Sequence, residues 1–95
     1  MRRTQTHYVV VHCSATRASS DIGASTIRDW HVNDRGWRDI GYHYVVRRSG
    51  EIENGRHVDD SGAHAKGYNA RSVGICMVGG LDEAGNAEDN FTVPQ

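Results

Sequence analysis

The stretch VVVHCS at Val9–Ser14 predicts a β-strand that ends on chemically active side chains. β-Branched residues favour strands, and alternation places Val10 and His12 on one face and Val11 and Cys13 on the other. Apolar residues on both faces predict a central strand that is covered on both sides. A titratable side chain at the carboxyl end of such a strand lies where α/β sheets usually place their chemistry. His12 is therefore either a core histidine held by one hydrogen bond, or a ligand or catalyst.

The size and charge of the chain limit what it can be. It has 95 residues, enough for one small domain with a modest core. Its net charge of -1 and its pI of about 6.6 argue against a binder of nucleic acid or anionic membranes that relies on bulk charge. No apolar run is long enough to span a bilayer, and no signal-peptide core follows the first residues. We therefore expect a protein that is cytoplasmic when made.

The other apolar runs predict an α/β fold, with a mixed central β-sheet flanked by helices. Turn signals and periodicity set the bounds of the elements. Strands are expected at Tyr8–Cys13, Tyr42–Arg47 and Ser72–Val78, a short hairpin partner at Glu51–Glu53, and a helix at Ser25–Asp34. Ile27, Trp30 and His31 fall on one face of that helix, and packing against the sheet is the simplest role for this face.

The chain is rich in side chains that bind metals or carry protons. It has six histidines and two cysteines. Cys13 and Cys76 lie in apolar runs, where buried and reduced thiols are the common state. Residues 55–69 form a long polar loop, and loops of this length inside compact domains are usually functional or disordered. A metal or acid–base site is therefore worth seeking among the histidines.

The last residues predict the start of a helix. Thr92–Gln95 reads TVPQ, which has the form of a capping box, and Phe91 is placed to act as a hydrophobic staple. Proline is well tolerated in the first turn of a helix. An isolated first turn has no stability of its own, because helix nucleation is unfavourable. We therefore expect the chain to be the N-terminal part of a longer domain.

Five short motifs follow one another along the chain. They are VHCSAT at 11–16, IRDWH at 27–31, GYHY at 41–44, HAKGYN at 64–69 and VGICMVGG at 73–80. Together they resemble the type 2 N-acetylmuramoyl-L-alanine amidases, a superfamily that also contains the peptidoglycan recognition proteins. The most similar group is the short bacteriophage lysozymes that act as amidases, and the resemblance runs from Tyr8 to Phe91. Five motifs in one order are a far more specific signal than any one of them.

The resemblance implies a zinc-dependent hydrolase that lyses cell walls. Such an enzyme cuts the amide between the lactyl group of N-acetylmuramic acid and the L-alanine of the stem peptide in peptidoglycan. In the family, two histidines and one thiolate hold Zn²⁺ and water takes the fourth position, which is the pattern of a catalytic zinc. Bound zinc lowers the pKa of this water and polarises the scissile carbonyl.

The resemblance also assigns roles to individual residues. His12 matches the first zinc ligand of the family. Tyr42 matches the tyrosine beside the metal, which orients the attacking water or stabilises the oxyanion. His64, Lys66 and Asn69 belong to the segment that lines the substrate cleft, where Lys66 would meet the carboxylates of the peptide.

The chain departs from the family at its carboxyl end. In the family, the second histidine ligand, the thiolate and a catalytic lysine lie beyond the helix that would begin at Thr92. Residues 1–95 thus correspond to roughly the N-terminal two-thirds of one amidase-like domain, and we expect them to be inactive alone. The local substitutes are His43, His57 and His64. None is expected to complete the site, because His43 would face away from Tyr42 and the other two lie on a mobile loop.

Two further interpretations stay open. A non-catalytic peptidoglycan-binding module is the alternative function, since recognition proteins that lack the thiolate ligand bind muropeptides without cutting them. Tyr42 favours the enzyme, because a pure binder has no need of it. In the family, C-terminal helices cover one face of the sheet, so we also expect an uncovered apolar face and a possible homodimer through it.

Overall fold

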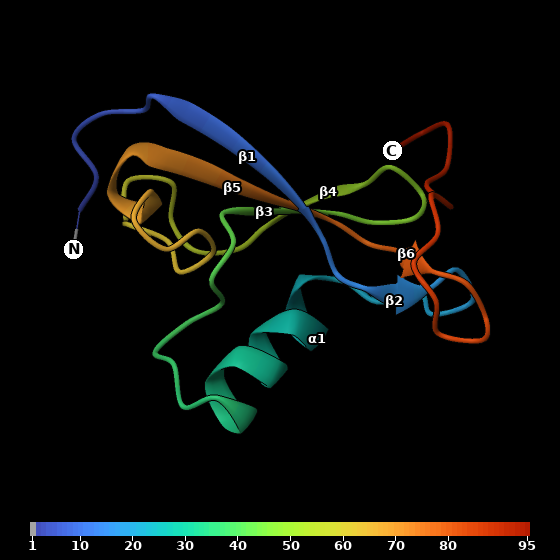
Figure 1. Ribbon diagram of the computed structural model, residues 1–95. Coiled ribbons are helices and arrows are strands. Elements are labelled where there is room, and N and C mark those ends of the chain that lie inside the picture. Colours follow the sequence, from blue (N-terminus) through green and yellow to red (C-terminus); the bar gives the residue numbers. More distant parts are fainter. Residues whose placement is uncertain (1) are drawn as a thin grey trace.

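A computed structural model describes residues 2–95, so Met1 of the predicted 1–95 domain lies outside the described residues. The main sheet has four strands in the order β1-β5-β3-β4, and helix α1 lies beside it (Figure 1). β5 runs parallel to β1 and β3, whereas β3 and β4 are antiparallel. The bounds are β1 Tyr8–Cys13, β3 Tyr44–Val46, β4 Ile52–Asn54 and β5 Ser72–Met77. The predicted α/β fold with a mixed sheet is confirmed.

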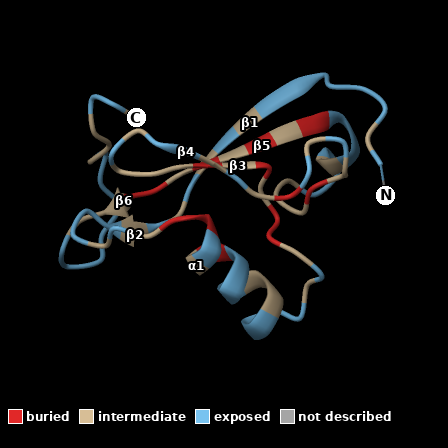
Figure 2. Cartoon of the chain, turned by 180° about the vertical axis from the view of Figure 1, so that it is seen from behind, coloured by how far each residue is buried: buried red, intermediate tan, exposed pale blue. Residues whose placement is uncertain are grey.

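The position predicted for the first strand is wrong. β1 has the predicted bounds, but it lies at the edge of the sheet and pairs with β5 alone within residues 2–95. Val9 and Val11 remain 62% and 61% exposed, and Figure 2 shows β1 largely in the colour of exposed residues beside the more buried β5. Apolar residues on both faces therefore did not mean that both faces are covered here.

One face of the sheet carries the core. The register pairs Val10 with Gly74 and His12 with Cys76, so these residues share a face. The buried cluster on that side joins the sheet to α1, and its members are Ala24, Ile27, Ile40, Val45, Cys76 and Val78. Both cysteines are free, as predicted, but only Cys76 is buried; Cys13 points to the opposite face and is exposed, because that face is uncovered.

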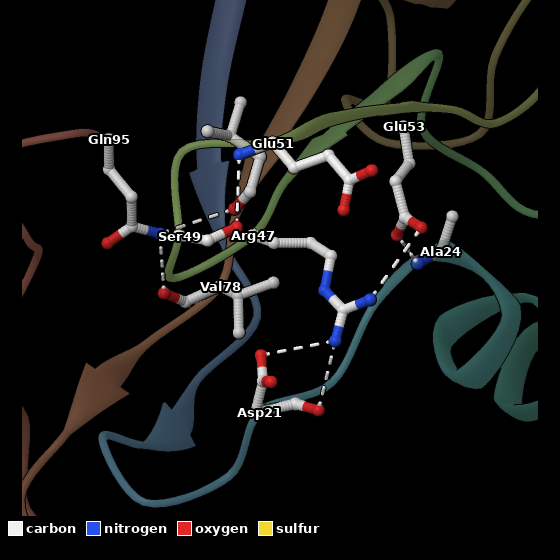
Figure 3. A network of polar contacts seen from close by, with 9 residues as sticks. Asp21, Ala24, Arg47, Ser49, Glu51, Glu53, Val78 and Gln95 are labelled. Carbon is white, nitrogen blue, oxygen red and sulfur yellow. Dashed lines mark hydrogen bonds and ion pairs between the residues drawn. The ribbon is translucent and has the colours of Figure 1, made fainter.

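The predicted helix is present, starts one residue early and changes type. α1 covers Ala24–Asp29 and continues as a π-helix over Trp30–Asp34. Gly23 occupies the N-cap position and offers no side chain, so Oε1 of Glu53 on β4 accepts the Ala24 N–H at 2.8 Å. Figure 3 shows this contact beside Arg47, whose guanidinium lies 3.2 Å from Asp21 and 3.9 Å from Glu53.

A second, smaller sheet was not predicted. β2 (Thr16–Arg17) pairs in parallel with β6 (Gly80–Leu81) just beyond the ends of β1 and β5. The Ser14 hydroxyl bridges the gap, because its Oγ accepts the Gly79 N–H at 3.0 Å. The two long strands therefore continue, after a break, into the two short ones.

The two hydrogen bonds of the predicted capping box are present, and they close a turn at Thr92–Gln95. The Thr92 N–H donates to Oε1 of Gln95 at 2.9 Å, and the Gln95 N–H donates back to Oγ1 of Thr92 at 3.4 Å. Nε2 of Gln95 also donates to the carbonyl of Val78 at 2.9 Å and to that of Val46 at 3.2 Å, which fixes the turn against the sheet (Figure 3). No helix within residues 2–95 is both long and apolar enough to cross a membrane.

Candidate functional site

A cleft of about 390 Å³ opens between the end of the α1 segment and the polar loop before β5. Its lining holds histidines, aromatic rings and cations, and the residues are His31, Arg35, Trp37, Tyr42, Ala63, His64, Ala65, Lys66 and Asn69. A smaller hollow of about 140 Å³ adjoins it and shares His31, Arg35 and Tyr42. The cleft therefore brings together, around Tyr42, segments that are far apart in the sequence.

His12, Tyr42 and His64 meet beside this cleft. The ring centres of His12 and Tyr42 are 5.3 Å apart, and those of His12 and His64 are 5.1 Å apart. Nε2 of His12 lies 3.0 Å from Nδ1 of His64, which is a hydrogen bond between two imidazoles. The structure thus places His12 next to Tyr42, as predicted, and the ring of His64 contacts His12 directly.

His43 does not face away from Tyr42, so that prediction is wrong. β3 begins only at Tyr44, and the alternation of a strand does not apply to the two residues before it. The ring centres of Tyr42 and His43 lie 6.5 and 5.8 Å from that of His64, so both approach the same ring. His43 is buried, its Nδ1 accepts the Gly74 N–H at 2.9 Å, and its Nε2 lies 2.7 Å from the Asp60 carbonyl oxygen.

Hydrogen bonds connect the polar loop, which was predicted to be mobile, to the rest of the fold. The buried guanidinium of Arg56 donates to the carbonyls of Ile40 and Ser61 at 2.9 and 2.8 Å. Oδ1 of Asn69 accepts the N–H groups of His64 and Ala65, both at 2.9 Å. A 3₁₀ helix over Asn69–Arg71 then leads into β5. His64 therefore stands on backbone that is held at both ends.

Two glycines make room for the His64 ring. A Cβ atom on Gly74, in the middle of β5, would lie 2.6 Å from Cδ2 and Cγ of His64. A Cβ atom on Gly62 would lie 2.6 Å from Cδ2 of the same ring. Neither glycine has a positive φ angle, so here the need for glycine is space and not backbone conformation.

The histidines of the site are electrically neutral at pH 7. Burial, together with the neighbouring His12 and His43, lowers the pKa of His64 to about 4. Burial also lowers the pKa of His12 and that of His43. The pKa of His31 is lowered by burial and by the charges of Arg35 and Arg56. A neutral imidazole has one unprotonated ring nitrogen, which can accept a hydrogen bond, a proton or a metal ion.

Tyr42 keeps its proton. Burial and the nearby thiols of Cys76 and Cys13 raise the pKa of Tyr42 to about 12. Burial likewise raises the pKa of Cys76 to about 12, so this thiol is protonated at neutral pH and is not a reactive thiolate. The phenol is therefore a hydrogen-bond donor beside His12 and not an anion.

The other predicted site residues also line the cleft. Lys66 is exposed at this position. Asn69 lines it too, but its Oδ1 is occupied by the loop backbone, so it orders the loop that carries His64. The substrate-binding segment predicted from the motif HAKGYN is therefore one wall of the cleft.

Three further residues of the lining were not predicted as site residues. His31, Arg35 and Trp37 form the wall opposite the loop; the rings of His31 and Trp37 are 4.6 Å apart, and Nδ1 of His31 accepts the Gly41 N–H at 2.9 Å. Trp30 was predicted to pack in the core, but it is 36% exposed and borders the smaller hollow. The switch to a π-helix at Trp30 changes the face that each side chain occupies, which the spacing of an α-helix cannot predict.

Metal-binding side chains are sparse around His12. Within residues 2–95, no group of three histidine, cysteine, aspartate or glutamate side chains could hold a metal ion together. Cys13 is on the opposite face of β1. A second hollow of about 520 Å³ lies at this end of the strand, and Val11, Cys13 and Phe91 line it together with His12. We assign the functional site to the smaller cleft, because His64 and the phenol of Tyr42 line it and the ring of His12 contacts both.

Comparison with known proteins agrees with this geometry. Residues 2–95 match the N-acetylmuramoyl-L-alanine amidase family. The chain is 52% identical over 94 residues to the endolysin of Klebsiella phage KP32, an alignment that covers 99% of this chain and 62% of the relative. The solved endolysin amidase LysCS from Clostridium intestinale has a TM-score of 0.78 at 32% identity, over 96% of this chain and 54% of that one. Peptidoglycan recognition protein-LE, solved in complex with tracheal cytotoxin, has a TM-score of 0.73 at 34% identity, over 85% of this chain and 51% of that one.

The sheet, the cleft and these likenesses define the class of protein. The chain belongs to the N-acetylmuramoyl-L-alanine amidase family. The resemblance to phage endolysins and to peptidoglycan recognition proteins that the motifs predicted is confirmed. The chain spans 62% of the length of the endolysin that it matches.

Proposed function

We propose that this chain is the N-terminal part of an N-acetylmuramoyl-L-alanine amidase that cleaves peptidoglycan and lyses cell walls. The bond to be cut is the amide between N-acetylmuramic acid and the L-alanine of the stem peptide. The family match over residues 2–95 and the similarity to a phage endolysin support this activity. We further propose that the protein is made in the cytoplasm and acts on the cell wall.

The observation that carries the proposal is the pairing of Tyr42 with His12 beside an open cleft. Amide hydrolysis passes through a tetrahedral intermediate whose oxygen becomes negative, and a fixed hydrogen-bond donor stabilises this charge. With a pKa of about 12, Tyr42 is such a donor, and its ring centre lies 5.3 Å from that of the predicted ligand His12. We assign catalysis to Tyr42 on this basis.

The opposite walls of the cleft fit an acidic peptide. Lys66 lies on the loop wall, and Arg35 lies on the wall that follows α1, where its guanidinium is 5.4 Å from the centre of the Trp37 ring. Stem peptides of peptidoglycan carry carboxylates, which pair with lysine and arginine. We propose that His64, Lys66 and Asn69 contact the substrate, with Arg35 and Trp37 on the other side.

Zinc dependence is part of the proposal, with His12 as one ligand. A catalytic zinc needs three protein ligands, and residues 2–95 contain no group of three suitable side chains. The described part of the chain therefore does not fit a complete zinc site, and the other ligands would come from outside it. We expect the chain alone to be inactive and to bind zinc weakly.

Zinc titration tests this expectation. The chain is stripped with a chelator, zinc is added back, and binding is followed by calorimetry for the chain and for His12→Ala. Weak binding that falls further in His12→Ala is expected. Tight binding of one ion that needs His12 would show that the site is complete within this chain or a dimer of it, and would overturn the predicted inactivity.

Amidase activity is tested with a version extended by a relative's segment that supplies the missing ligands. The extended protein should release new L-alanine amino termini from purified peptidoglycan, and Tyr42→Phe should lower this rate by about 10²-fold, as expected for one lost oxyanion donor. Ile52→Ala, on the exposed edge strand β4, is a control that should keep full activity. Absence of amino-terminal release from a folded, zinc-loaded extended protein would refute the proposed reaction.

A binding module that does not cut peptidoglycan is the second candidate. Its support is the likeness to a recognition protein solved in complex with tracheal cytotoxin. Co-sedimentation of the chain with insoluble peptidoglycan, without release of amino termini, would favour this function. Loss of co-sedimentation in Lys66→Ala would then locate binding in the cleft.

A further inference from the structure

A directed chain of hydrogen bonds ends on His12, and the roles proposed above make no use of it. It begins at Ser72, which is fully buried and whose hydroxyl donates to the Tyr68 carbonyl oxygen at 2.8 Å. A hydroxyl group has one hydrogen to give, whereas its oxygen can also accept. Oγ of Ser72 lies 3.3 Å from Nε2 of His64. Since the hydroxyl hydrogen is already used, Nε2 of His64 must be the donor of this bond.

The direction of the next bond follows. A neutral histidine carries one ring hydrogen, so Nδ1 of His64 has none and can only accept. Its partner at 3.0 Å is Nε2 of His12, which must therefore carry the hydrogen and donate it. Nδ1 of His12 is then the ring nitrogen that keeps a free lone pair.

The structure supports the His64 ring in this position on its other sides. Gly74 leaves space for the ring, and the neighbouring His43 is itself fixed by two backbone groups. The Gly74 N–H donates to Nδ1 of His43, so Nε2 of His43 donates to the Asp60 carbonyl oxygen at 2.7 Å. The rings of His43 and His64 meet edge to face, with centres 5.8 Å apart.

We propose that His64 is a positioning residue that fixes the tautomer and ring orientation of His12. The relay from Ser72 through His64 makes Nδ1 of His12 the nitrogen that is free to bind a metal ion or a proton. Metal-binding histidines usually donate their other ring N–H to a fixed acceptor, and His64 is such an acceptor. The use made of Nδ1 rests on the proposed function, whereas the direction of the relay rests on the hydrogen bonds alone.

Nitrogen NMR of the metal-free chain tests the relay. Long-range ¹H–¹⁵N spectra show which ring nitrogen carries the hydrogen, and a scalar coupling across the N–H···N bond identifies its acceptor. We expect hydrogen on Nε2 of His12 with coupling to Nδ1 of His64. Hydrogen on Nδ1 of either ring, or an Nε2–H of His12 that exchanges freely with water, would overturn the proposal. His43, whose tautomer has two backbone partners, is the internal reference.

Variants separate the relay from a purely structural role. Ser72→Ala removes the acceptor of the His64 Nε2–H, so the tautomer ratio of His64 should shift about fivefold, the equivalent of one ordinary hydrogen bond. His64→Phe should free the His12 Nε2–H to exchange with water.

Ser25→Ala and His57→Phe, at exposed positions outside the relay, should leave the His12 spectrum unchanged. An unchanged His12 spectrum in folded Ser72→Ala and His64→Phe would contradict the relay. Because neither substrate nor metal is used, this outcome is distinct from a lack of amidase activity.

Discussion

Gly74 and the ring of His64 share a space in which one extra carbon atom does not fit. The two residues lie on different segments, and the ring lies directly over the backbone of β5. The glycine and the histidine are thus one structural unit, although they belong to separate motifs of the sequence. The position of His64 therefore depends on Gly74, a residue without a side chain. Because His64 contacts His12, the position of His12 depends on Gly74 as well.

Gly74→Ala is predicted to destabilise the protein by about 1–3 kcal/mol, the usual cost of overpacking. The added Cβ would lie 2.6 Å from two ring atoms of His64, so the ring must move and the bond to His12 must weaken. Urea unfolding of the single variants and of Gly74→Ala combined with His64→Ala measures the coupling. The cost of Gly74→Ala should shrink once the ring is removed. An equal cost in both backgrounds would mean that the ring is not the obstacle.

The pKa of His64 predicts how stability changes with pH. The pKa is 6.5 in the unfolded chain and about 4 in the folded one, so between these values the unfolded chain binds a proton that the folded chain does not. The free energy of unfolding therefore rises with pH across this window, and stability is lost as pH falls from 6.5 towards 4. Because the ring is only half-buried, solvent screening limits the loss to about 1–2 kcal/mol.

Urea unfolding at about pH 7 and about pH 4.5 measures this loss, which is expected from the linkage between protonation and folding. His64→Gln cannot titrate and should show a smaller difference between the two pH values. His57→Gln is the matched control, since His57 is exposed and its removal should leave the difference unchanged. A pH difference in His64→Gln equal to that of the parent would assign the loss to other groups.

At the scale of the elements, the start of α1 depends on the hairpin. The N-cap residue Gly23 has no side chain to accept a helix N–H, and Glu53 of β4 supplies the acceptor from another part of the chain. Arg47 lies between Glu53 and Asp21, which ties the segment before α1 to the end of β3 (Figure 3). Sheet and helix are therefore joined by polar contacts as well as by the core.

Glu53→Ala is predicted to cost about 1–2 kcal/mol, in the range of a lost helix cap. Glu53→Gln keeps an oxygen acceptor for the Ala24 N–H and loses only the charge beside Arg47, so it should cost less. Amide hydrogen exchange at Ala24–Ile27, together with urea unfolding, would show the effect where it arises. Glu51→Ala, at an exposed position of the same hairpin, should leave both measurements unchanged.

The sequence predicted the strands and the helix better than it predicted which elements lie next to one another in the fold. Alternation along Tyr8–Cys13 assigned His12 and Cys13 to opposite faces correctly, because that property is local. The number of partners of a strand depends on where distant strands pair, so the edge position of β1 could not be read from its own residues. The prediction that Tyr42 and His43 face opposite ways rested on strand alternation, and it failed because β3 begins only after these two residues. The motifs did assign Tyr42 to the neighbourhood of His12, through resemblance to a known family.

The site could be predicted only in part, because its residues also come together through contacts between distant parts of the sequence. His12 and His64 are separated by 52 residues, and no local pattern tells that their nitrogens lie 3.0 Å apart. Gly74 was a usable signal, since a glycine inside a strand often marks close approach of another group. The cleft wall formed by His31 and Arg35 depends on the π-helix, which α-helical spacing does not predict.

At the scale of the whole molecule, the two faces of the sheet differ sharply. α1 and the polar loop cover the face that carries His12, whereas Val9 and Val11 on the other face stay exposed. Figure 2 shows β1 largely in the colour of exposed residues. β1 is also an edge strand, so its outer backbone groups have no strand partner within residues 2–95. An apolar face next to a free edge favours association with another chain.

We therefore predict that the chain forms a homodimer through β1 and the face that carries Val9 and Val11. Sedimentation velocity over a range of concentrations, with a reductant because Cys13 is exposed, should show a monomer–dimer equilibrium. Val11→Lys should weaken the dimer by about tenfold or more, because burying a lysine on an apolar face costs more than 1.4 kcal/mol. Ile52→Lys places the same charge on a residue that is 66% exposed on β4, at the opposite edge of the sheet, and should leave the equilibrium unchanged. A monomer at all concentrations would refute the dimer, and dissociation by Ile52→Lys alone would place the contact on β4.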